Sequence, residues 1–334
     1  MTNDLTLLLE ITRNCNLFCK HCYNYDLNKT MSFRDLEIDE LKIILHKLVN
    51  AGINQLILTG GEPLSCKNLE NFFQALKQYP ELIFSINTNG ILLLNDNVFK
   101  LFLENKDLFA QLNLSLESGD PEINDNIRGK GQFHNIIKVL ELCYQEQIPL
   151  LVNTTIGSYN MNSIDSIFSL MDKYDINNVN FGLYIPWQSS MRDLKPLTRD
   201  QVRLMCDYLL EKEESGWNIQ TCSMPYLKFL SPGIEGACCY LFKDLLTVNY
   251  KGDLTVCMMD NFKIGSILNM SLEYMMKTEK VREFLDPEQF KTKIRGKCAT
   301  CVKFVECLGC RFLTYTMTQE YYASDPYCPY HFTE

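Results

Sequence analysis

The first two thirds of the chain alternate between short apolar runs and segments whose apolar residues recur at helical spacing. This pattern predicts strands over 5–11, 56–58, 82–86, 112–116, 150–156 and 179–185. It predicts helices between and after them over 36–49, 69–76, 98–103, 133–144, 164–174 and 198–214, the last with Thr198 as its N-cap. Six strand-then-helix units favour a parallel sheet with right-handed crossovers. The alternation fits an open doubly wound sheet and an incomplete barrel equally well.

The pattern changes after Trp217, where the segments become short and rich in cysteine and tyrosine. Ser231-Pro232-Gly233 marks a turn in this stretch. A chain of 334 residues has room for one elaborated barrel and a small second domain. We therefore predict two domains, over 1–220 and 221–334.

Composition and charge exclude several classes of protein. The hydrophobic fraction of 46% and the charged fraction of 22% are ordinary for a globular protein. The formal charge is −9 and no segment is densely basic, which disfavours binding to nucleic acid through phosphates. No apolar stretch reaches about 18 residues, and the N-terminus does not resemble a secretory signal. We expect a cytoplasmic protein that binds neither nucleic acid nor membranes.

The 15 cysteines are the main anomaly in the composition. They are too few for a disulfide scaffold, their number is odd, and no export signal precedes them. A reducing compartment would keep them as thiols, which favours metal binding. Most fall into two groups, which are Cys15, Cys19 and Cys22 near the start, and Cys238, Cys239, Cys257, Cys298, Cys301, Cys307, Cys310 and Cys328 in the last third.

The first group forms a CxxxCxxC motif directly after the first predicted strand. Three thiolates on one loop can hold three irons of a 4Fe–4S cluster and leave the fourth iron open to a substrate or cofactor. A zinc site completed by His21 or a nearby acid is the alternative. Loops at the carboxyl ends of barrel strands carry catalytic groups, which favours a functional site here.

Five segments together resemble the signature of radical S-adenosylmethionine (SAM) enzymes. They are the CxxxCxxC motif followed by Tyr23, then Thr59-Gly60-Gly61-Glu62-Pro63, Thr88-Asn89-Gly90, Ser115-Leu116-Glu117-Ser118 and Asp125-Asn126-Ile127-Arg128-Gly129. The last four follow in the family's order, each at or after a predicted strand end. The resemblance covers about residues 5–215 and implies an α/β fold, a partial (β/α)6 TIM-like barrel.

The resemblance also implies roles for individual residues. The backbone of Gly60 and Gly61 and the Glu62 carboxylate would meet the amino group of SAM, and Asn89 would belong to the cofactor site. Ser115 would contact SAM, Glu117 would lie near its ribose, and Arg128 would meet its carboxylate. The implied chemistry is reductive cleavage of SAM to a 5′-deoxyadenosyl radical, which abstracts a hydrogen atom from the substrate. No electron donor is visible in the chain beyond its own clusters, so a flavodoxin or ferredoxin is the expected partner.

The second group of cysteines resembles the SPASM domain, a small cysteine-rich domain that binds one or two auxiliary iron–sulfur clusters. Its last gap, between Cys307 and Cys310, has two residues where the usual form has three. The family's interleaved pattern implies one cluster on Cys298, Cys301, Cys307 and Cys328, and another on Cys239, Cys257 and Cys310. Cys238, Cys222 or an open iron remain alternatives for the fourth ligand of the second cluster. Structural zinc sites are the alternative for the whole group.

The resemblance favours an enzyme that modifies a ribosomally made peptide by a crosslink, a thioether or an epimerisation. A small molecule or a tetrapyrrole is the alternative substrate. A non-catalytic iron–sulfur or zinc protein, such as a redox sensor or electron carrier, is the alternative class, but it would not need the SAM-contact motifs. Only four residues precede the first strand, so we expect a separate leader-recognition protein or a substrate that needs none. If the reaction requires a thiol as hydrogen donor, Cys222 is the candidate.

Overall fold

The computed structural model describes residues 5–25, 31–186, 194–236, 245–259, 262–279, 281–282 and 286–332. The predicted ligand Cys239 and its neighbour Cys238 lie outside the described residues. Every other residue that the sequence singles out as a ligand or contact is described.

Within these residues, eleven strands form one continuous sheet in the order β11-β10-β9-β1-β2-β3-β4-β5-β6-β7-β8. The strands from β1 to β8 neighbour one another in chain order and all pair in parallel. A doubly wound sheet reverses its strand order at a switch point, so this sequential order decides for the partial barrel. These strands are β1 (Thr6–Thr12), β2 (Gln55–Gly60), β3 (Ile83–Thr88), β4 (Phe109–Ser115), β5 (Leu150–Ile156), β6 (Asn178–Leu183), β7 (Asn218–Cys222) and β8 (Glu235–Gly236).

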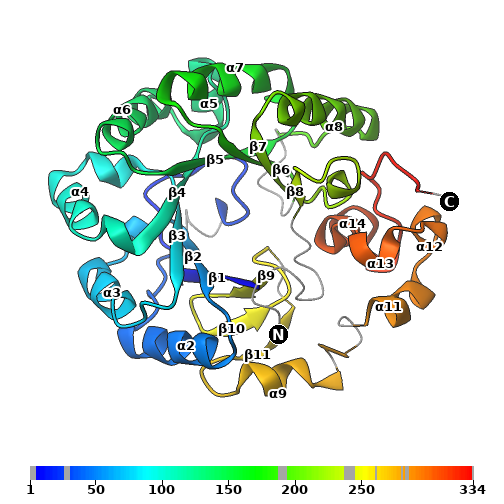
Figure 1. Ribbon diagram of the computed structural model, residues 1–334, viewed down its shortest axis with the longest axis horizontal. Coiled ribbons are helices and arrows are strands. Elements are labelled where there is room, and N and C mark those ends of the chain that lie inside the picture. The colour runs from blue at the N-terminus through cyan, green and yellow to red at the C-terminus, as the bar shows by residue number, and fades with distance from the viewer. Residues whose placement is uncertain are drawn as a thin grey trace.

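The helices cover the outer face of the curved sheet, as Figure 1 shows. All six predicted strand–helix units are present, with ends that differ from the prediction by a few residues. Thr198 caps its helix as predicted, because its side chain accepts a hydrogen bond from the Gln201 amide. The helices are α2 (Ile38–Asn50), α3 (Leu69–Leu76), α4 (Asp96–Leu103), α6 (Gln132–Gln145), α7 (Ile164–Met171) and α8 (Arg199–Glu214).

The pattern of apolar residues does not predict the helix α5 (Pro121–Arg128). Its start follows the rules for helix ends, because the Asp120 side chain accepts hydrogen bonds from the Glu122 and Ile123 amides and Pro121 stands at the first helical position. Arg128 is the last residue of this helix. The helix therefore determines where that guanidinium enters the barrel.

In the C-terminal part, the described residues form three short strands and several short helices. β9 pairs in parallel with β1 on the edge that β2 does not use, so this part extends the barrel sheet. The predicted boundary at residue 220 stays a prediction, and it falls within β7. The elements are β9 (Leu245–Val248), β10 (Asp253–Thr255), β11 (Lys263–Ser266), α9 (Leu272–Met276), α11 (Pro287–Lys293), α12 (Lys297–Thr300), α13 (Phe304–Cys307) and α14 (Arg311–Thr318).

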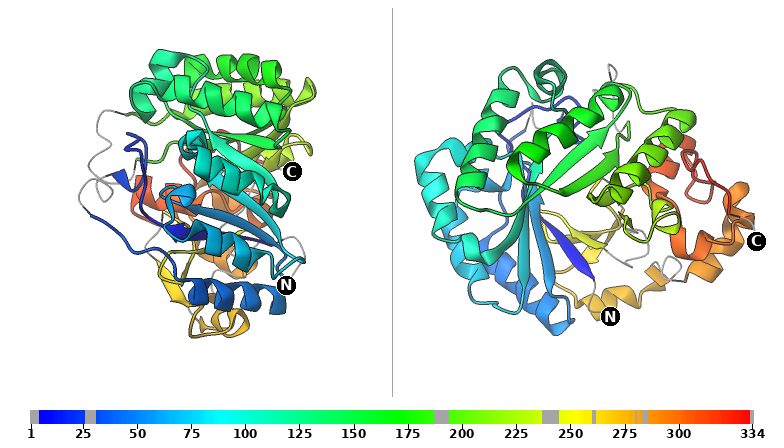
Figure 2. Two further views of the ribbon diagram at one scale, coloured as in Figure 1. Left: turned by 90° about the vertical axis from the view of Figure 1, so that its left-hand side faces the viewer. Right: turned by 45° about the horizontal axis from the view of Figure 1, so that its top comes forward.

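A buried polar cluster joins β1 to the loop after β9. The fully buried Glu10 carboxylate binds Arg13 at 2.8 Å and accepts a hydrogen bond from the Tyr250 amide. The Arg13 guanidinium in turn lies 4.8 Å from the centre of the Tyr250 ring. In the two further views of Figure 2, the C-terminal elements accordingly lie beside the barrel edge that begins with β1.

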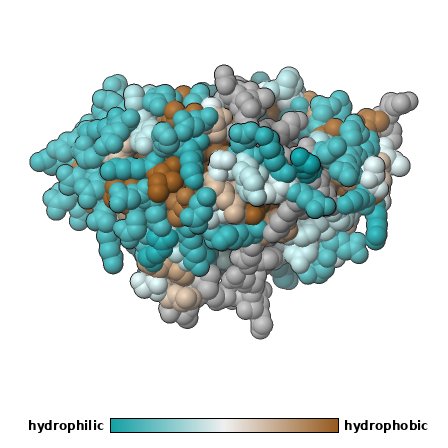
Figure 3. Space-filling view, turned by 90° about the horizontal axis from the view of Figure 1, so that it is seen from below, coloured by the Kyte–Doolittle hydropathy of each residue, from teal (hydrophilic) through white to brown (hydrophobic). Residues whose placement is uncertain are grey.

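One described face of the molecule is predominantly polar. Figure 3 shows one face on which hydrophilic residues predominate and hydrophobic ones occur in small patches. Among the helices of the described ranges, none combines the length and the hydropathy needed to cross a membrane.

Candidate active site and auxiliary metal sites

The CxxxCxxC loop leaves the carboxyl end of β1 and lines a cavity of about 370 Å³ inside the barrel. Cys15, Cys19 and Cys22 all contribute to the cavity wall. The Leu17 amide donates to the Cys15 sulfur and the Asn24 amide donates to the Cys22 sulfur, each at 3.4 Å. Amide hydrogen bonds to cysteine sulfurs are a common feature of iron–sulfur sites. The local backbone therefore already supports the thiolates that a cluster requires.

Gly60 and Gly61 stand at the end of β2, where the backbones of two loops meet. The Gly61 amide donates to the Thr12 carbonyl at 2.8 Å, and the Glu62 amide donates to the Asn14 carbonyl at 2.8 Å. A Cβ atom on Gly61 would lie 2.2 Å from the Asn14 oxygen, which no side chain can occupy. The two glycines also line the cavity. Because these glycines have no side chain, the backbone after β2 can lie directly against the loop after β1, which carries the cysteines.

The Glu62 carboxylate is buried and binds three groups of the protein. It accepts hydrogen bonds from the Leu64 amide at 3.1 Å, the Thr88 hydroxyl at 2.7 Å and the Asn89 amide at 2.7 Å. Burial raises the pKa of Glu62, although these hydrogen bonds oppose the shift. Asn89 continues the connection, because its side-chain amide donates to Asn16 at 2.8 Å. Glu62 and Asn89 thus join the ends of β2 and β3 to the CxxxCxxC loop.

Arg128, Glu117 and His21 form a second buried polar group at the cavity. Arg128 Nη1 donates to Glu117 Oε1 at 3.0 Å, and His21 Nε2 lies 3.4 Å from the same oxygen. The other Glu117 oxygen accepts a hydrogen bond from the Thr155 amide at 2.9 Å. Arg128 and His21 line the cavity, together with Ser115, whose hydroxyl donates to the Thr88 carbonyl. Burial lowers the pKa of His21 despite the neighbouring carboxylate, so the ring is neutral near pH 7.

Asparagines on the inner wall of the barrel are a feature that the motif analysis missed. Asn113 donates to Asn87 across β3 and β4, and Asn180 donates to Asn153 across β5 and β6, each at 2.8 Å. Asn87, Asn153 and Asn180 line the cavity. Asparagine is disfavoured in strands, so its recurrence in the four successive strands β3 to β6 could have indicated a polar inner wall of the barrel.

The residues at the cavity fit a thiolate-bound cluster with a polar ligand. Burial raises the pKa of Cys15 to about 12 and that of Cys22 to about 11, so both are neutral thiols until iron displaces their protons. Two buried polar atoms, His21 Nδ1 and Arg128 Nε, have no hydrogen-bond partner within the described residues. Polar atoms left unpaired in a buried site indicate a ligand that completes their bonding.

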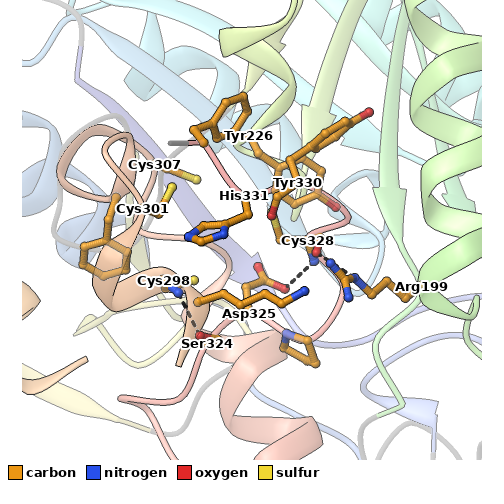
Figure 4. A pocket seen from close by; sticks show the side chains of 15 residues that line it. Arg199, Tyr226, Cys298, Cys301, Cys307, Ser324, Asp325, Cys328, Tyr330 and His331 are labelled. Carbon is orange, nitrogen blue, oxygen red and sulfur yellow. Dashed lines mark hydrogen bonds between the residues drawn. The ribbon is translucent and has the colours of Figure 1, made fainter. Parts of the chain in front are cut away.

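A second cavity of about 190 Å³ lies in the C-terminal part and is drawn in Figure 4. Four sulfurs line it, those of Cys298, Cys301, Cys307 and Cys328. Cys310 does not line this cavity; its thiol is instead within electrostatic range of Cys222 and Cys257. The interleaved ligand grouping that the family resemblance implies stays a prediction. Nowhere in the described ranges do three His, Cys, Asp or Glu side chains converge as ligands of a single metal ion.

Asp325 connects the two groups of cysteines, and the sequence analysis did not single it out. One carboxylate oxygen accepts a hydrogen bond from the Cys310 amide at 2.9 Å. The other accepts from the Tyr327 amide at 2.9 Å and the Cys328 amide at 3.2 Å. Burial raises the pKa of Asp325, and the nearby Arg311 guanidinium opposes that shift. In the sequence, the only indication of this role was that Asp325 stands three residues before Cys328.

Comparison with known families agrees with this geometry. The family description of the Radical SAM superfamily matches residues 9–171, and that of the SPASM iron–sulfur cluster-binding domain matches residues 238–302. The chain is a radical SAM enzyme of the SPASM subfamily. Its cofactors are therefore a 4Fe–4S cluster, SAM and auxiliary iron–sulfur clusters.

Relatives and solved structures cover nearly the whole chain. The AdoMet-dependent heme synthase of Methanosarcina barkeri is 26% identical over 99% of this chain and 98% of its own length. The mycofactocin maturase MftC of Mycolicibacterium smegmatis is 24% identical over 91% of this chain and 77% of its own. Among solved structures, anSMEcpe with bound AdoMet has a TM-score of 0.76 at 19% identity, covering 97% of this chain and 94% of its own. SuiB of Streptococcus suis bound to S-adenosylmethionine has a TM-score of 0.74 at 17% identity, over 98% and 77%. The structural matches establish the fold that the SPASM radical SAM enzymes share with this chain.

Proposed function

We propose that this radical SAM enzyme modifies a peptide whose reacting segment is uncharged. The observation that carries the proposal is the chemistry of the barrel cavity. Its described wall consists of amide, hydroxyl, thiol, aromatic and aliphatic groups together with His21, and its one guanidinium, on Arg128, is paired with Glu117. Such a wall offers hydrogen bonds to peptide groups and little charge to a polyanionic substrate.

The chain's residues have distinct roles in this proposal. Cys15, Cys19 and Cys22 hold the 4Fe–4S cluster, and the amides of Leu17 and Asn24 stabilise two of its thiolates. When bound, the cluster and SAM supply the 5′-deoxyadenosyl radical that removes a substrate hydrogen atom.

Residues from several other loops form the SAM site. The Gly60–Gly61 backbone and Ser115 contact SAM at the wall of the cavity, and Arg128 directs its guanidinium to the carboxylate of SAM. Glu62, Asn89 and Glu117 act at least partly as positioning residues, because each binds neighbouring loops or Arg128 in this structure.

The auxiliary clusters follow the same grouping of cysteines. We propose that Cys298, Cys301, Cys307 and Cys328 hold one cluster, since their sulfurs line one cavity. Cys257 and Cys310 belong to the other. A domain of this size has a small core, so ligation supplies part of its folding free energy.

One partner completes the proposal. A flavodoxin or ferredoxin in a reducing cytoplasm supplies the electron. The solved structure of SuiB bound to its precursor peptide SuiA supports a peptide as the class of substrate for this fold. MftC, a maturase by name, supports it as well.

A tetrapyrrole is the second candidate substrate. The observation that favours it is the similarity to the heme synthase of M. barkeri over the full length of both proteins. Tetrapyrroles of the haem pathway carry several carboxylates, which proteins bind with arginine and lysine. The described cavity wall has no lysine and no second arginine, which is why we rank the peptide first.

The experiment compares both substrates under one set of conditions. The anaerobically reconstituted full chain is incubated with SAM, dithionite and either the short peptides encoded beside its gene or an iron coproporphyrin. We expect 5′-deoxyadenosine in both reactions and a mass change only in a peptide. Decarboxylation of the porphyrin with no change in any peptide would replace the first candidate by the second. Absence of 5′-deoxyadenosine with every substrate would contradict the proposed SAM site.

A further inference from the structure

Cys222 stands at the carboxyl end of β7 and faces the barrel cavity. It pairs in register with Gly182 of β6, and its side chain is exposed to the same cavity that the CxxxCxxC cysteines line. A Cβ atom on Gly182 would lie 3.6 Å from the Cβ of Cys222. Glycine at this neighbouring position leaves space beside the thiol.

The backbone after Cys222 holds this thiol in a fixed place. Ser223 has a positive φ of 69°, which is unfavourable for a residue with a side chain. Its buried hydroxyl accepts a hydrogen bond from the Leu183 amide at 3.0 Å and donates to the Cys222 carbonyl. Strained backbone that neighbouring groups stabilise is typical of functional positions. The turn therefore fixes Cys222 against β6.

Two other cysteines approach the same region from separate elements. Cys310 is the N-cap residue of α14 and directly precedes the first residue of that helix. Its thiol is within electrostatic range of both Cys222 and Cys257. Cys257 follows β10 and is also within range of Tyr23, the residue after the CxxxCxxC motif. The three thiols thus gather between the barrel cavity and the C-terminal part.

We propose that Cys222 ligates the same auxiliary iron–sulfur cluster as Cys257 and Cys310. The inference rests on the proposed function, which places an auxiliary cluster on Cys257 and Cys310. Thiolates of a cluster occupy its outer corners, so three cysteines from three elements can surround it without meeting at one point. On ligation each thiol forms a sulfur–iron bond and releases its proton to solvent, with no change of oxidation state at sulfur.

The assignment has a consequence for the reaction cavity. Cys222 and Met259, two residues after Cys257, both line that cavity. An auxiliary cluster bound by Cys222 therefore forms part of the cavity wall. The same assignment removes Cys222 as a hydrogen donor, because a ligating thiolate has no hydrogen atom to give.

The test measures the clusters and needs no substrate. The full chain is reconstituted anaerobically as the Cys222→Ala variant, with Cys143→Ala as the matched control because Cys143 is buried in α6 away from both cavities. For Cys222→Ala we expect a loss of up to roughly four irons per chain, or a changed spectrum of one auxiliary cluster in Mössbauer and EPR measurements. The control should keep the iron and the spectra of the native protein. A Cys222→Ala variant with native iron and native spectra of every auxiliary cluster would overturn the proposal and favour a hydrogen donor.

A second variant covers the case in which Cys222→Ala is insoluble. Cys222→Ser keeps an oxygen that can replace the thiolate, so we expect a full complement of iron with shifted EPR g-values for one auxiliary cluster. Native g-values for Cys222→Ser would overturn the proposal. Both readouts are independent of peptide modification, and the cleavage of SAM in the same samples reports separately on the proposed function.

Discussion

The Arg128 guanidinium donates from Nη1 to the Glu117 carboxylate at 3.0 Å, in a buried pair at the wall of the barrel cavity. Arg128 Nε has no partner within the described residues, so the guanidinium can still bind a ligand. A charge-assisted hydrogen bond contributes about 1.5–3 kcal/mol. One side chain is thus fixed by a carboxylate of the protein while it retains a donor for a carboxylate of the ligand.

The first prediction concerns this pair. Arg128→Ala should weaken SAM binding roughly tenfold to hundredfold, because the variant lacks the charged donor. Equilibrium binding of SAM to the reconstituted protein measures the effect. Arg34→Ala is the control, since Arg34 forms a partly exposed ion pair with Glu40 outside the cavity and should leave SAM binding unchanged. Equal affinity of the native protein and Arg128→Ala would exclude Arg128 from the SAM site.

The second prediction separates the cluster of the barrel from the auxiliary clusters. Simultaneous replacement of Cys15, Cys19 and Cys22 by alanine should abolish cleavage of SAM and remove roughly four irons per chain. The cysteines proposed for the auxiliary clusters lie on other elements of the chain, so the absorbance of the auxiliary clusters should remain. Formation of 5′-deoxyadenosine by the triple variant with dithionite would refute the assignment.

The third prediction compares two cysteines of the C-terminal part. Cys328→Ala should lower total iron and solubility, because Cys328 lines the cavity of four sulfurs and its ligation holds the C-terminus on the domain. Cys310→Ala should change the spectrum of the other auxiliary cluster, since the Cys310 thiol is near Cys222 and Cys257. Mössbauer spectra of the two variants distinguish the sites. Loss of the same signal in both would favour a single site on Cys298, Cys301, Cys307 and Cys310.

The fourth prediction concerns Asp325, whose carboxylate binds the amides of Cys310 and Cys328. Asp325→Asn replaces one acceptor oxygen by an amide group, which cannot accept from the second amide. We expect reduced iron at both auxiliary sites and a loss of stability of about 1.5–3 kcal/mol in chemical denaturation. Asp286→Asn is the matched control, because asparagine caps a helix as well as aspartate does. If only one auxiliary signal changes, Asp325 does not couple the two sites.

The fifth prediction concerns the contact between the loops after β1 and β2. Gly61→Ala should displace the CxxxCxxC loop, because the new Cβ would lie 2.2 Å from the Asn14 oxygen. Iron incorporation at the barrel cluster should fall. Gly52→Ala is the control, since it has open space and a positive φ of 73° and should cost only about 1–2 kcal/mol of backbone strain. Native iron content in Gly61→Ala would show that the loop can move without losing its ligands.

The barrel could be predicted from the sequence because its buried strands and amphipathic helices carry a strong apolar pattern. The helix α5 escaped that analysis, since Ile123 and Ile127 are the only apolar side chains after its first residue, Pro121. The motifs identified residues around the cavity because each motif stands at or after the end of a predicted strand, and the strand ends of a barrel meet at one face. They did not predict that Glu62 and Glu117 are already bonded to protein groups, which depends on contacts between separate loops.

The C-terminal site was less accessible to sequence analysis. The resemblance to the SPASM domain implied two interleaved groups of cysteines. In the structure, Cys298, Cys301, Cys307 and Cys328 line one cavity, and the Cys310 thiol is within electrostatic range of Cys257. Asp325 was missed because its role depends on the chain returning to Cys310 after α14. The contact between Asp325 and Cys310 depends on the path of the folded loop, and a periodic pattern in the sequence does not predict such a path.

The pairing of β9 with β1 has a consequence for synthesis of the chain. One edge of the first strand binds β2, which begins at residue 55, and the other binds β9, which begins at residue 245. The ribosome therefore adds 190 residues between the two partners (245 minus 55). At a translation rate of about 5–20 residues per second, this edge remains unpaired for roughly 10–40 s. An exposed strand edge is a template for aggregation, so the nascent chain depends on chaperones or on rapid assembly of the C-terminal part.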